Sequence, residues 1–181
     1  MLKKVFFFLA ALSAAVNLMV YAGPQKTDGH KTLSAEELLE KIKLQAGKNF
    51  ILLDCRPEDE YRAGHIPGAL NVSMDSLAFG KNTALKSSME NIFKQAGRII
   101  DFILIDSASG KEYMPQSKLE ELLRLLPENR YQEIILYCRS AECTRSPMAI
   151  RWTLALGYEN VWRYEGGWKE WAAKKLPTEI K

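Results

Sequence analysis

Two cysteines, Cys138 and Cys143, lie within one short segment of the chain, and an arginine accompanies each of them. A thiol does its chemistry as the thiolate, and nearby positive charge favours ionisation of the thiol. Arg139 and Arg145 bring two full positive charges into the segment. The same charges would attract an anionic substrate. The residue types therefore predict a reactive cysteine that works on an anion.

The flanking sequence predicts that this segment is a loop between a strand and a helix. The run Glu133–Tyr137 is typical of a buried strand, and Cys138 follows it directly. Ser146 is a good helix N-cap, and Pro147 is favoured at the first helical position. Unpaired N–H groups and the helix dipole at such a start add partial positive charge, which also suits an anion. We therefore expect Cys138 to have a depressed pKa and Cys143 to lie on the outer rim of the loop, although an ordinary strand-to-helix connection with a bystander cysteine remains the alternative.

Strands and helices alternate along the rest of the chain. The pattern Ser34-Ala35-Glu36-Glu37 is a capping box that predicts the start of a helix. Further strands are expected at 50–53, 70–72, 99–105 and 161–164, and further helices at 58–62, 117–126, 147–156 and 168–175. Such alternation favours a parallel sheet with helices on both faces. Ligands bind at the carboxyl ends of strands in these sheets, and Cys138 is expected there.

The N-terminal residues have the layout of a signal peptide. Lys3 and Lys4 precede the apolar run 5–20, and Ala22 supplies a small residue at the expected cleavage site. A membrane anchor is the alternative, but the run is a little short for a span of about 20 residues. We therefore expect cleavage of residues 1–22, no stable membrane span afterwards, and a periplasmic or otherwise exported protein.

The remaining chain is expected to form a linker over 23–33 and one domain over 34–178. Its length fits an ordinary domain with a core of its own. The net charge of the whole chain is +3, and the expected signal peptide carries two lysines and no acid. We find no long basic run and no extended stripe of aromatic residues interleaved with Lys or Arg, so binding of nucleic acid is not expected.

The chain has 3 cysteines, an odd number that leaves at least one thiol unpaired within the monomer. The third, Cys55, follows the apolar run at 50–53 after a single aspartate, Asp54. A cysteine in that position is expected to behave as a small buried hydrophobic residue.

Several ordered motifs of this chain together resemble the rhodanese-like domain, a family of sulfurtransferases. They are Leu53-Asp54-Cys55-Arg56, Gly64-His65-Ile66-Pro67-Gly68-Ala69, Tyr137-Cys138-Arg139 with Arg145-Ser146, Leu156-Gly157-Tyr158-Glu159-Asn160-Val161 and Glu165-Gly166-Gly167-Trp168. The resemblance implies a five-stranded parallel sheet with helices on both faces. It also implies a structural role for Asp54, Arg56 and His65.

The resemblance further implies transfer of a sulfane sulfur through a persulfide on Cys138. The donor would be a small anion such as thiosulfate, the acceptor a thiol or a cyanide-like molecule, and no metal or organic cofactor would be needed. Residues implied to bind the substrate are Arg139, Ser140, Ala141, Glu142, Cys143, Thr144, Arg145 and Ser146.

Two departures from the family pattern leave alternatives open. The segment from Cys138 to Ser146 is longer than the usual loop and holds the second thiol, Cys143. The two thiols could form a disulfide, pass a persulfide between them, or not interact. A periplasmic dithiol redox protein and a non-catalytic rhodanese-like binding module are the other functions considered; the spacing of Cys138 and Arg145 fits a phosphatase-like or arsenate-reducing loop poorly. Residues 74–132 also exceed what a minimal domain needs, and 99–114 are expected to form an inserted hairpin.

Overall fold

The computed structural model describes residues 30–45, 50–79, 103–106, 111–114 and 116–181. These residues fall into two compact units. One comprises residues 25–75 and 121–181, and the other includes residues 76–120. The expected signal peptide at 1–22, and the linker before residue 30, lie outside the described residues.

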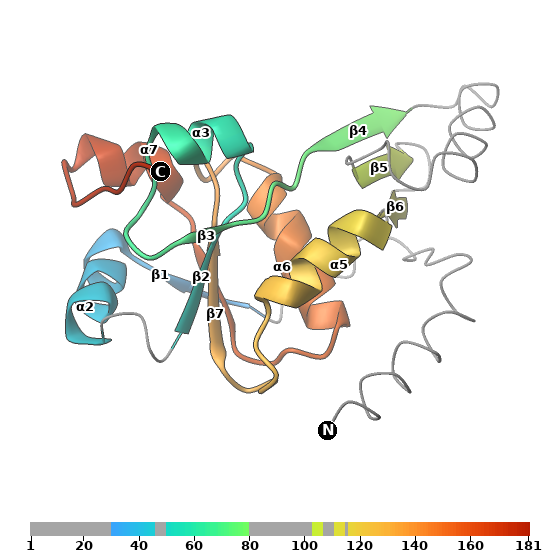
Figure 1. Ribbon diagram of the computed structural model, residues 1–181, viewed down its shortest axis with the longest axis horizontal. Coiled ribbons are helices and arrows are strands. Elements are labelled where there is room, and N and C mark those ends of the chain that lie inside the picture. The colour runs from blue at the N-terminus through green and yellow to red at the C-terminus, as the bar shows by residue number, and fades with distance from the viewer. Residues whose placement is uncertain (1–29, 46–49, 80–102, 107–110, 115) are drawn as a thin grey trace. The chain divides into compact units, whose positions relative to one another are not determined.

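The larger unit is built on a parallel sheet. Its strands among the described residues are β1 (Lys31–Leu33), β2 (Phe50–Asp54), β3 (Leu70–Asn71), β7 (Glu133–Tyr137) and β8 (Val161–Tyr164). They are ordered β1-β8-β7-β2-β3, and every neighbouring pair is parallel (Figure 1). This arrangement confirms the five-stranded parallel sheet that the sequence predicted, and it places β7, the strand before Cys138, in the centre.

The expected linker over 23–33 is corrected at its end. Lys31–Leu33 is not a linker but the edge strand β1, which pairs with β8 so that Lys31 lies opposite Trp162 and Leu33 opposite Tyr164. A strand of 3 residues is too short to show an alternating pattern in the sequence.

Helices cover both faces of this sheet. The helices of the larger unit are α2 (Ala35–Gln45), α3 (Glu58–Ala63), α6 (Arg145–Ala155) and α7 (Gly167–Ala173), and α5 (Gln116–Leu125) leads into it. Figure 1 shows α2 and α7 on one side of the sheet and α6 on the other. The predicted capping box at the start of α2 is confirmed, because the Ser34 N–H donates to Glu37 Oε2 at 2.7 Å and the Glu37 N–H donates to Ser34 Oγ at 3.2 Å.

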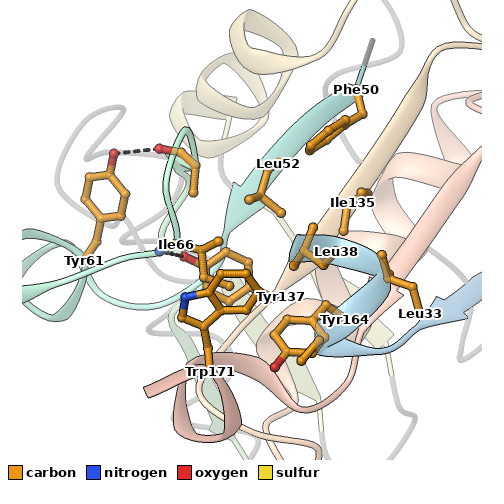
Figure 2. Packing of buried hydrophobic residues seen from close by; sticks show 12 residues of the cluster. Leu33, Leu38, Phe50, Leu52, Tyr61, Ile66, Ile135, Tyr137, Tyr164 and Trp171 are labelled. Carbon is orange, nitrogen blue, oxygen red and sulfur yellow. Dashed lines mark hydrogen bonds between the residues drawn. The ribbon is translucent and has the colours of Figure 1, made fainter. Parts of the chain in front are cut away.

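The side chains of β7 alternate between the two faces. Ile135 and Tyr137 belong to a buried cluster that includes Leu38 of α2 and Trp171 of α7 (Figure 2). Residues that alternate with them, such as Leu136, are equally buried, and they face the opposite side of the sheet because successive side chains of a strand point to opposite faces. Burial on both faces explains why Glu133–Tyr137 is a nearly continuous apolar run.

The smaller unit contains a separate sheet. Its described strands are β4 (Ser76–Phe79), β5 (Ile103–Asp106) and β6 (Lys111–Tyr113), in the order β4-β5-β6. The antiparallel pairing of β5 and β6 confirms the hairpin predicted within 99–114, and β4 adds a parallel strand to it. Within the described parts of the chain, we find no helix long and apolar enough to span a membrane.

Candidate active site

Cys138 lies where the sequence placed it, directly after the central strand β7 and before the loop that leads into α6. One detail is corrected. Helix α6 begins at Arg145 with Thr144 in the N-cap position, so Ser146 is not the N-cap. Ser146 instead lies in the first turn of α6, fully buried, and its hydroxyl donates to Cys138 Sγ at 3.5 Å.

The backbone of this loop, residues 138–144, is held by neighbouring elements. The first turn of α7 binds its start, because the Trp168 N–H donates to the Cys138 carbonyl oxygen at 2.9 Å and the Lys169 N–H donates to the Arg139 carbonyl oxygen at 2.9 Å. Arg163 of β8 binds its middle by donating to the Ala141 carbonyl oxygen at 2.7 Å. These contacts fix the path of the chain around Cys138.

Gly167 allows α7 to approach the loop this closely. Its φ is +60°, in the left-handed region that favours glycine, and a Cβ atom at this position would collide with the carbonyl oxygen of Cys138. The backbone of Arg139 and Ser140 would lie 2.9 Å from the same Cβ. The motif Glu165-Gly166-Gly167-Trp168 therefore serves the site by making room for the loop.

We expect Gly167→Ala to displace the loop and to lower activity more than about a hundredfold, because misplacement of reacting groups by about 1 Å costs that much. Release of sulfite from thiosulfate, the donor that the sequence resemblance implies, measures the effect, and circular dichroism checks that the fold persists. Gly68→Ala is the matched control, since Gly68 also has a positive φ of 76° but has no atom within 4 Å of an added Cβ. Equal activities of the two variants would contradict the packing role of Gly167.

The two thiols of the loop differ in exposure and surroundings. The turn closed by the Cys143 N–H and the Ser140 carbonyl oxygen, at 3.1 Å, brings Cys143 back beside Cys138. Cys138 is 1% exposed, whereas Cys143 is half-buried, and Arg145 Nη1 lies 3.8 Å from Cys143 Sγ. Both cysteines are free thiols.

The surroundings of the two thiols favour negative charge on Cys143 at rest. The pKa of Cys143 is lowered to about 5, first by its interaction with Cys138 and then by the backbone N–H groups of Arg145 and Arg139 and the Arg145 guanidinium, which together outweigh the cost of burial. The same interaction between the thiols, together with burial, raises the pKa of Cys138. The prediction that Cys138 has the lower pKa is therefore wrong, because two backbone N–H groups and the Arg145 guanidinium act on Cys143, whereas Cys138 is more deeply buried and has only the Ser146 N–H and hydroxyl.

A Cys143 pKa below that of Cys138 predicts an unusual pH dependence of thiol reactivity. The rate of alkylation by iodoacetamide should stay nearly constant around neutral pH and fall as the pH drops through about 5, because the pKa of Cys143 is lowered to that value. A thiol with the ordinary pKa of about 8.5 would instead react about tenfold faster for each unit of pH rise. Cys143→Ser should remove the low-pH transition, and a midpoint near that of free cysteine in the parent protein would contradict the assignment.

The two arginines of the loop have different roles. Arg145 forms a salt bridge with Asp75 at 2.8 Å, and its Nη1 lies 3.8 Å from the Cys143 sulfur. The Arg139 guanidinium is paired with Glu60. Arg139 therefore contributes its backbone N–H to the Cys143 thiolate, while its side chain ties the loop to α3.

The other residues expected to bind the substrate lie around the same turn. The Ser140 hydroxyl donates to Glu142 Oε2 at 2.6 Å on the exposed side of the loop. Ala141 offers its carbonyl oxygen to Arg163, and Thr144 precedes α6.

A buried network of charged and polar side chains connects the sheet to the helix that binds the loop. Arg56 Nη2 lies 2.6 Å from Asp54 Oδ2, and the Tyr137 hydroxyl donates to the same carboxylate oxygen at 2.7 Å. The Arg56 guanidinium also donates to the Gly64 carbonyl oxygen at 2.7 Å and packs 4.6 Å from the ring centre of Trp168. The network thus joins β2 and β7 to Trp168 of α7, whose N–H binds the Cys138 carbonyl oxygen.

The remaining titratable residues of the motifs hold the fold. His65 stacks on Tyr61 with ring centres 3.9 Å apart, and its Nδ1 lies 2.9 Å from the Tyr61 carbonyl oxygen. Its backbone pairs with Glu179 in both directions at 2.9 Å. Cys55 is fully buried, and burial raises its pKa, as expected for a cysteine that acts as a small apolar residue.

Sequence reasoning missed Arg163, Glu60 and Asp75, which hold the loop by the contacts described above. Nothing in the sequence pointed to a contact of these three residues with the loop, because each reaches the loop from a distant position in the sequence. In the described residues, no group of three or more His, Cys, Asp or Glu side chains is placed to hold a metal ion.

Comparisons with known proteins agree with this arrangement. The profile of the rhodanese-like domain matches residues 34–174. The chain is 31% identical over 161 residues to the rhodanese-like domain-containing protein 14, chloroplastic, of Arabidopsis thaliana, covering 82% of this chain and 66% of that protein. It is 26% identical over 168 residues to the sulfur carrier protein TtuD of Thermus thermophilus, covering 83% of this chain and 48% of that protein. The chain thus spans less than two thirds of the length of either relative.

Among solved structures, the crystal structure of the BH2092 protein of Bacillus halodurans is similar to this chain. The TM-score is 0.51, the identity is 18%, and the match covers 84% of this chain and 77% of that one. At this identity, the likeness shows the fold alone.

Proposed function

Because the chain belongs to the rhodanese-like domain family, we propose that it is a sulfurtransferase that carries a sulfane sulfur as a persulfide on Cys138. The observation that carries the proposal is the surroundings of the Cys138 sulfur. It lies at the carboxyl end of the central strand, within 3.5 Å of the Ser146 hydroxyl and in contact with a second thiol. A sulfur in this position has hydrogen-bond donors for an anion that forms on it.

The proposed reaction has two steps. Cys138 attacks the outer sulfur of an anionic donor such as thiosulfate, the bond between the two donor sulfurs breaks, and sulfite leaves with the electron pair. The proton of Cys138 moves to the neighbouring Cys143 thiolate, which is a base already in contact with it. An acceptor thiol or cyanide then attacks the outer sulfur of the persulfide and releases Cys138.

The surroundings of the loop suit a small anionic donor. The Arg145 guanidinium lies beside the pair of thiols, and the Ser146 N–H and hydroxyl favour negative charge on Cys138. The name of the Thermus relative, a sulfur carrier protein, supports transfer of sulfur in this family. A non-catalytic binding module would have no need of a thiol in these surroundings.

Sulfite release tests the proposal, because sulfite is the first product whatever the acceptor. Purified protein with thiosulfate and dithiothreitol, a thiol acceptor, should release sulfite continuously, whereas protein without thiosulfate should release none. Cys55→Ala is the control for loss of a thiol outside the loop and should keep turning over. Failure of the parent protein to release sulfite would overturn the proposal.

We also propose that residues 1–22 are a signal peptide and that the mature protein is exported. The support is the basic start at Lys3 and Lys4, the apolar run 5–20 and the small residue Ala22. N-terminal sequencing of the protein from the cell envelope should begin at Gly23. Full-length chain in the membrane fraction would show an anchor instead.

A further inference from the structure

The second thiol of the loop is not needed for a cycle in which an external acceptor takes the sulfur from Cys138. It is nevertheless brought against Cys138 by the turn from Ser140 to Cys143, whose hydrogen bond measures 3.1 Å. Cys138 Sγ lies 3.7 Å from the same Ser140 carbonyl oxygen that accepts the Cys143 N–H, so both cysteines gather at one carbonyl group, and each thiol shifts the pKa of the other. A persulfide on Cys138 would therefore form beside a second sulfur nucleophile.

The charges of the loop favour the thiolate form of that nucleophile. The Arg145 guanidinium is 3.8 Å from Cys143 Sγ and is itself fixed by Asp75 at 2.8 Å. Cys143 is also the more exposed of the two thiols. A thiolate fixed next to a persulfide can attack without the entropic cost of bringing in an external thiol.

Cys143 could attack either sulfur of the persulfide, and two considerations favour the inner one: its position next to Cys143 and the group that leaves. The inner sulfur, which is Cys138 Sγ, is the persulfide atom that the turn through Ser140 holds beside Cys143. Attack on the outer sulfur would expel the Cys138 thiolate, and a thiol with a raised pKa is a poor leaving group. Attack on the inner sulfur expels hydrosulfide instead and joins the two cysteines.

We propose that Cys143 is a built-in acceptor, which attacks the Cys138 sulfur of the persulfide, releases the outer sulfur as hydrosulfide and closes a Cys138–Cys143 disulfide. This inference rests on the proposed function. It makes the protein a thiosulfate reductase as well as a sulfur carrier, with a dithiol reductant as the partner that restores the two thiols.

The proposed reaction balances without any further oxidant. One thiosulfate, the Cys138 thiol and the Cys143 thiolate give one sulfite, one hydrosulfide and one disulfide. The sulfur–sulfur bond of the donor breaks and that of the protein disulfide forms. The outer sulfur is reduced to hydrosulfide and the two cysteines are oxidised. The proton of Cys138, which Cys143 holds after the first step, passes from Cys143 to the leaving sulfur, so that Cys143 attacks as the thiolate and the proton ends on hydrosulfide. An external dithiol then reduces the disulfide by exchange, and the stabilised Cys143 thiolate favours that direction.

A single turnover without any added thiol tests the inference. Reduced protein, freed of reductant, is mixed with thiosulfate, and sulfite, hydrosulfide and the intact mass are measured. The parent protein should release one equivalent each of sulfite and hydrosulfide per chain and lose two hydrogens. Cys143→Ser should release one equivalent of sulfite, more slowly because the neighbouring base is lost, give no hydrosulfide, and gain one sulfur atom. Cys55→Ala should behave as the parent does.

The outcomes separate this inference from the function on which it rests. If the parent protein releases sulfite but no hydrosulfide and gains one sulfur atom, the persulfide is stable beside Cys143 and the inference is overturned while the sulfurtransferase stands. The inference is equally overturned if Cys143→Ser releases hydrosulfide as the parent does. Absence of sulfite from the parent protein would overturn both proposals.

Discussion

Replacement of Cys138 by serine is expected to slow the release of sulfite from thiosulfate by at least about a thousandfold, the order of loss seen when an enzyme loses its nucleophile. The hydroxyl of serine is a far weaker nucleophile than a thiolate. Cys143 also loses the neighbouring Cys138 thiol that lowers its pKa, so it does not replace Cys138 as the nucleophile. The serine side chain is close in size to cysteine, so the contact with the Ser146 hydroxyl can persist. The rate of sulfite release under excess thiosulfate and dithiothreitol measures the effect.

Cys143→Ser is the comparison that identifies the nucleophile. With dithiothreitol as acceptor, this variant should keep a measurable rate of sulfite release, because Cys138 can still attack the donor. If instead Cys138→Ser retains turnover and Cys143→Ser abolishes it, Cys143 is the thiol that attacks thiosulfate. That result would reverse the roles that we propose for the two cysteines.

The largest loss of stability is expected from Asp54→Ala. The carboxylate of Asp54 is fully buried and accepts hydrogen bonds from Arg56 and from the Tyr137 hydroxyl. Its removal leaves the guanidinium of Arg56, which is only 1% exposed, without its counter-charge. Loss of one partner of a buried ion pair typically lowers the free energy of unfolding by about 3–5 kcal/mol. Urea denaturation followed by circular dichroism measures the change.

Glu58→Ala provides the control for this variant. Glu58 also forms an ion pair with an arginine, Arg62, but both side chains are 64% exposed. An exposed pair contributes less than about 1 kcal/mol, because water screens the charges and solvates the partner that remains. Equal losses of stability in Asp54→Ala and Glu58→Ala would show that burial of the Asp54–Arg56 pair is not what makes it important.

Much of the fold follows from local patterns in the sequence. Apolar runs predicted the central strands β2 and β7, and the pattern from Ser34 to Glu37 predicted the start of α2. The order of strand, loop and helix also placed Cys138 at the carboxyl end of a strand. The edge strand β1 was missed because its residues are held by pairing with β8 and not by a pattern of their own.

The electrostatics of the site could not be predicted in the same way. The sequence puts Arg139 and Arg145 equally close to the thiols, but their salt bridges with Glu60 and Asp75 join residues 79 and 70 positions apart. These partners decide that Arg145, rather than Arg139, keeps its guanidinium beside a sulfur. The turn that carries Cys143 into the cluster of backbone N–H groups likewise depends on the anchoring of the loop by α7 and Arg163.

The pairing of β2 with β7 has a consequence for how the chain folds. The hydrogen bond between Asp54 and Tyr137 joins residues 83 positions apart, with the unit at 76–120 between them. Closing so long a loop costs little extra in equilibrium stability, since each doubling of its length adds only about 0.6 kcal/mol. Sheets assembled from such distant pairs nevertheless fold slowly. Until β2 and β7 pair, Cys55 is not yet buried. In an oxidising medium, Cys55 of the newly made chain could therefore form a non-native disulfide with Cys138 or Cys143, the two thiols that the folded protein needs in the free form.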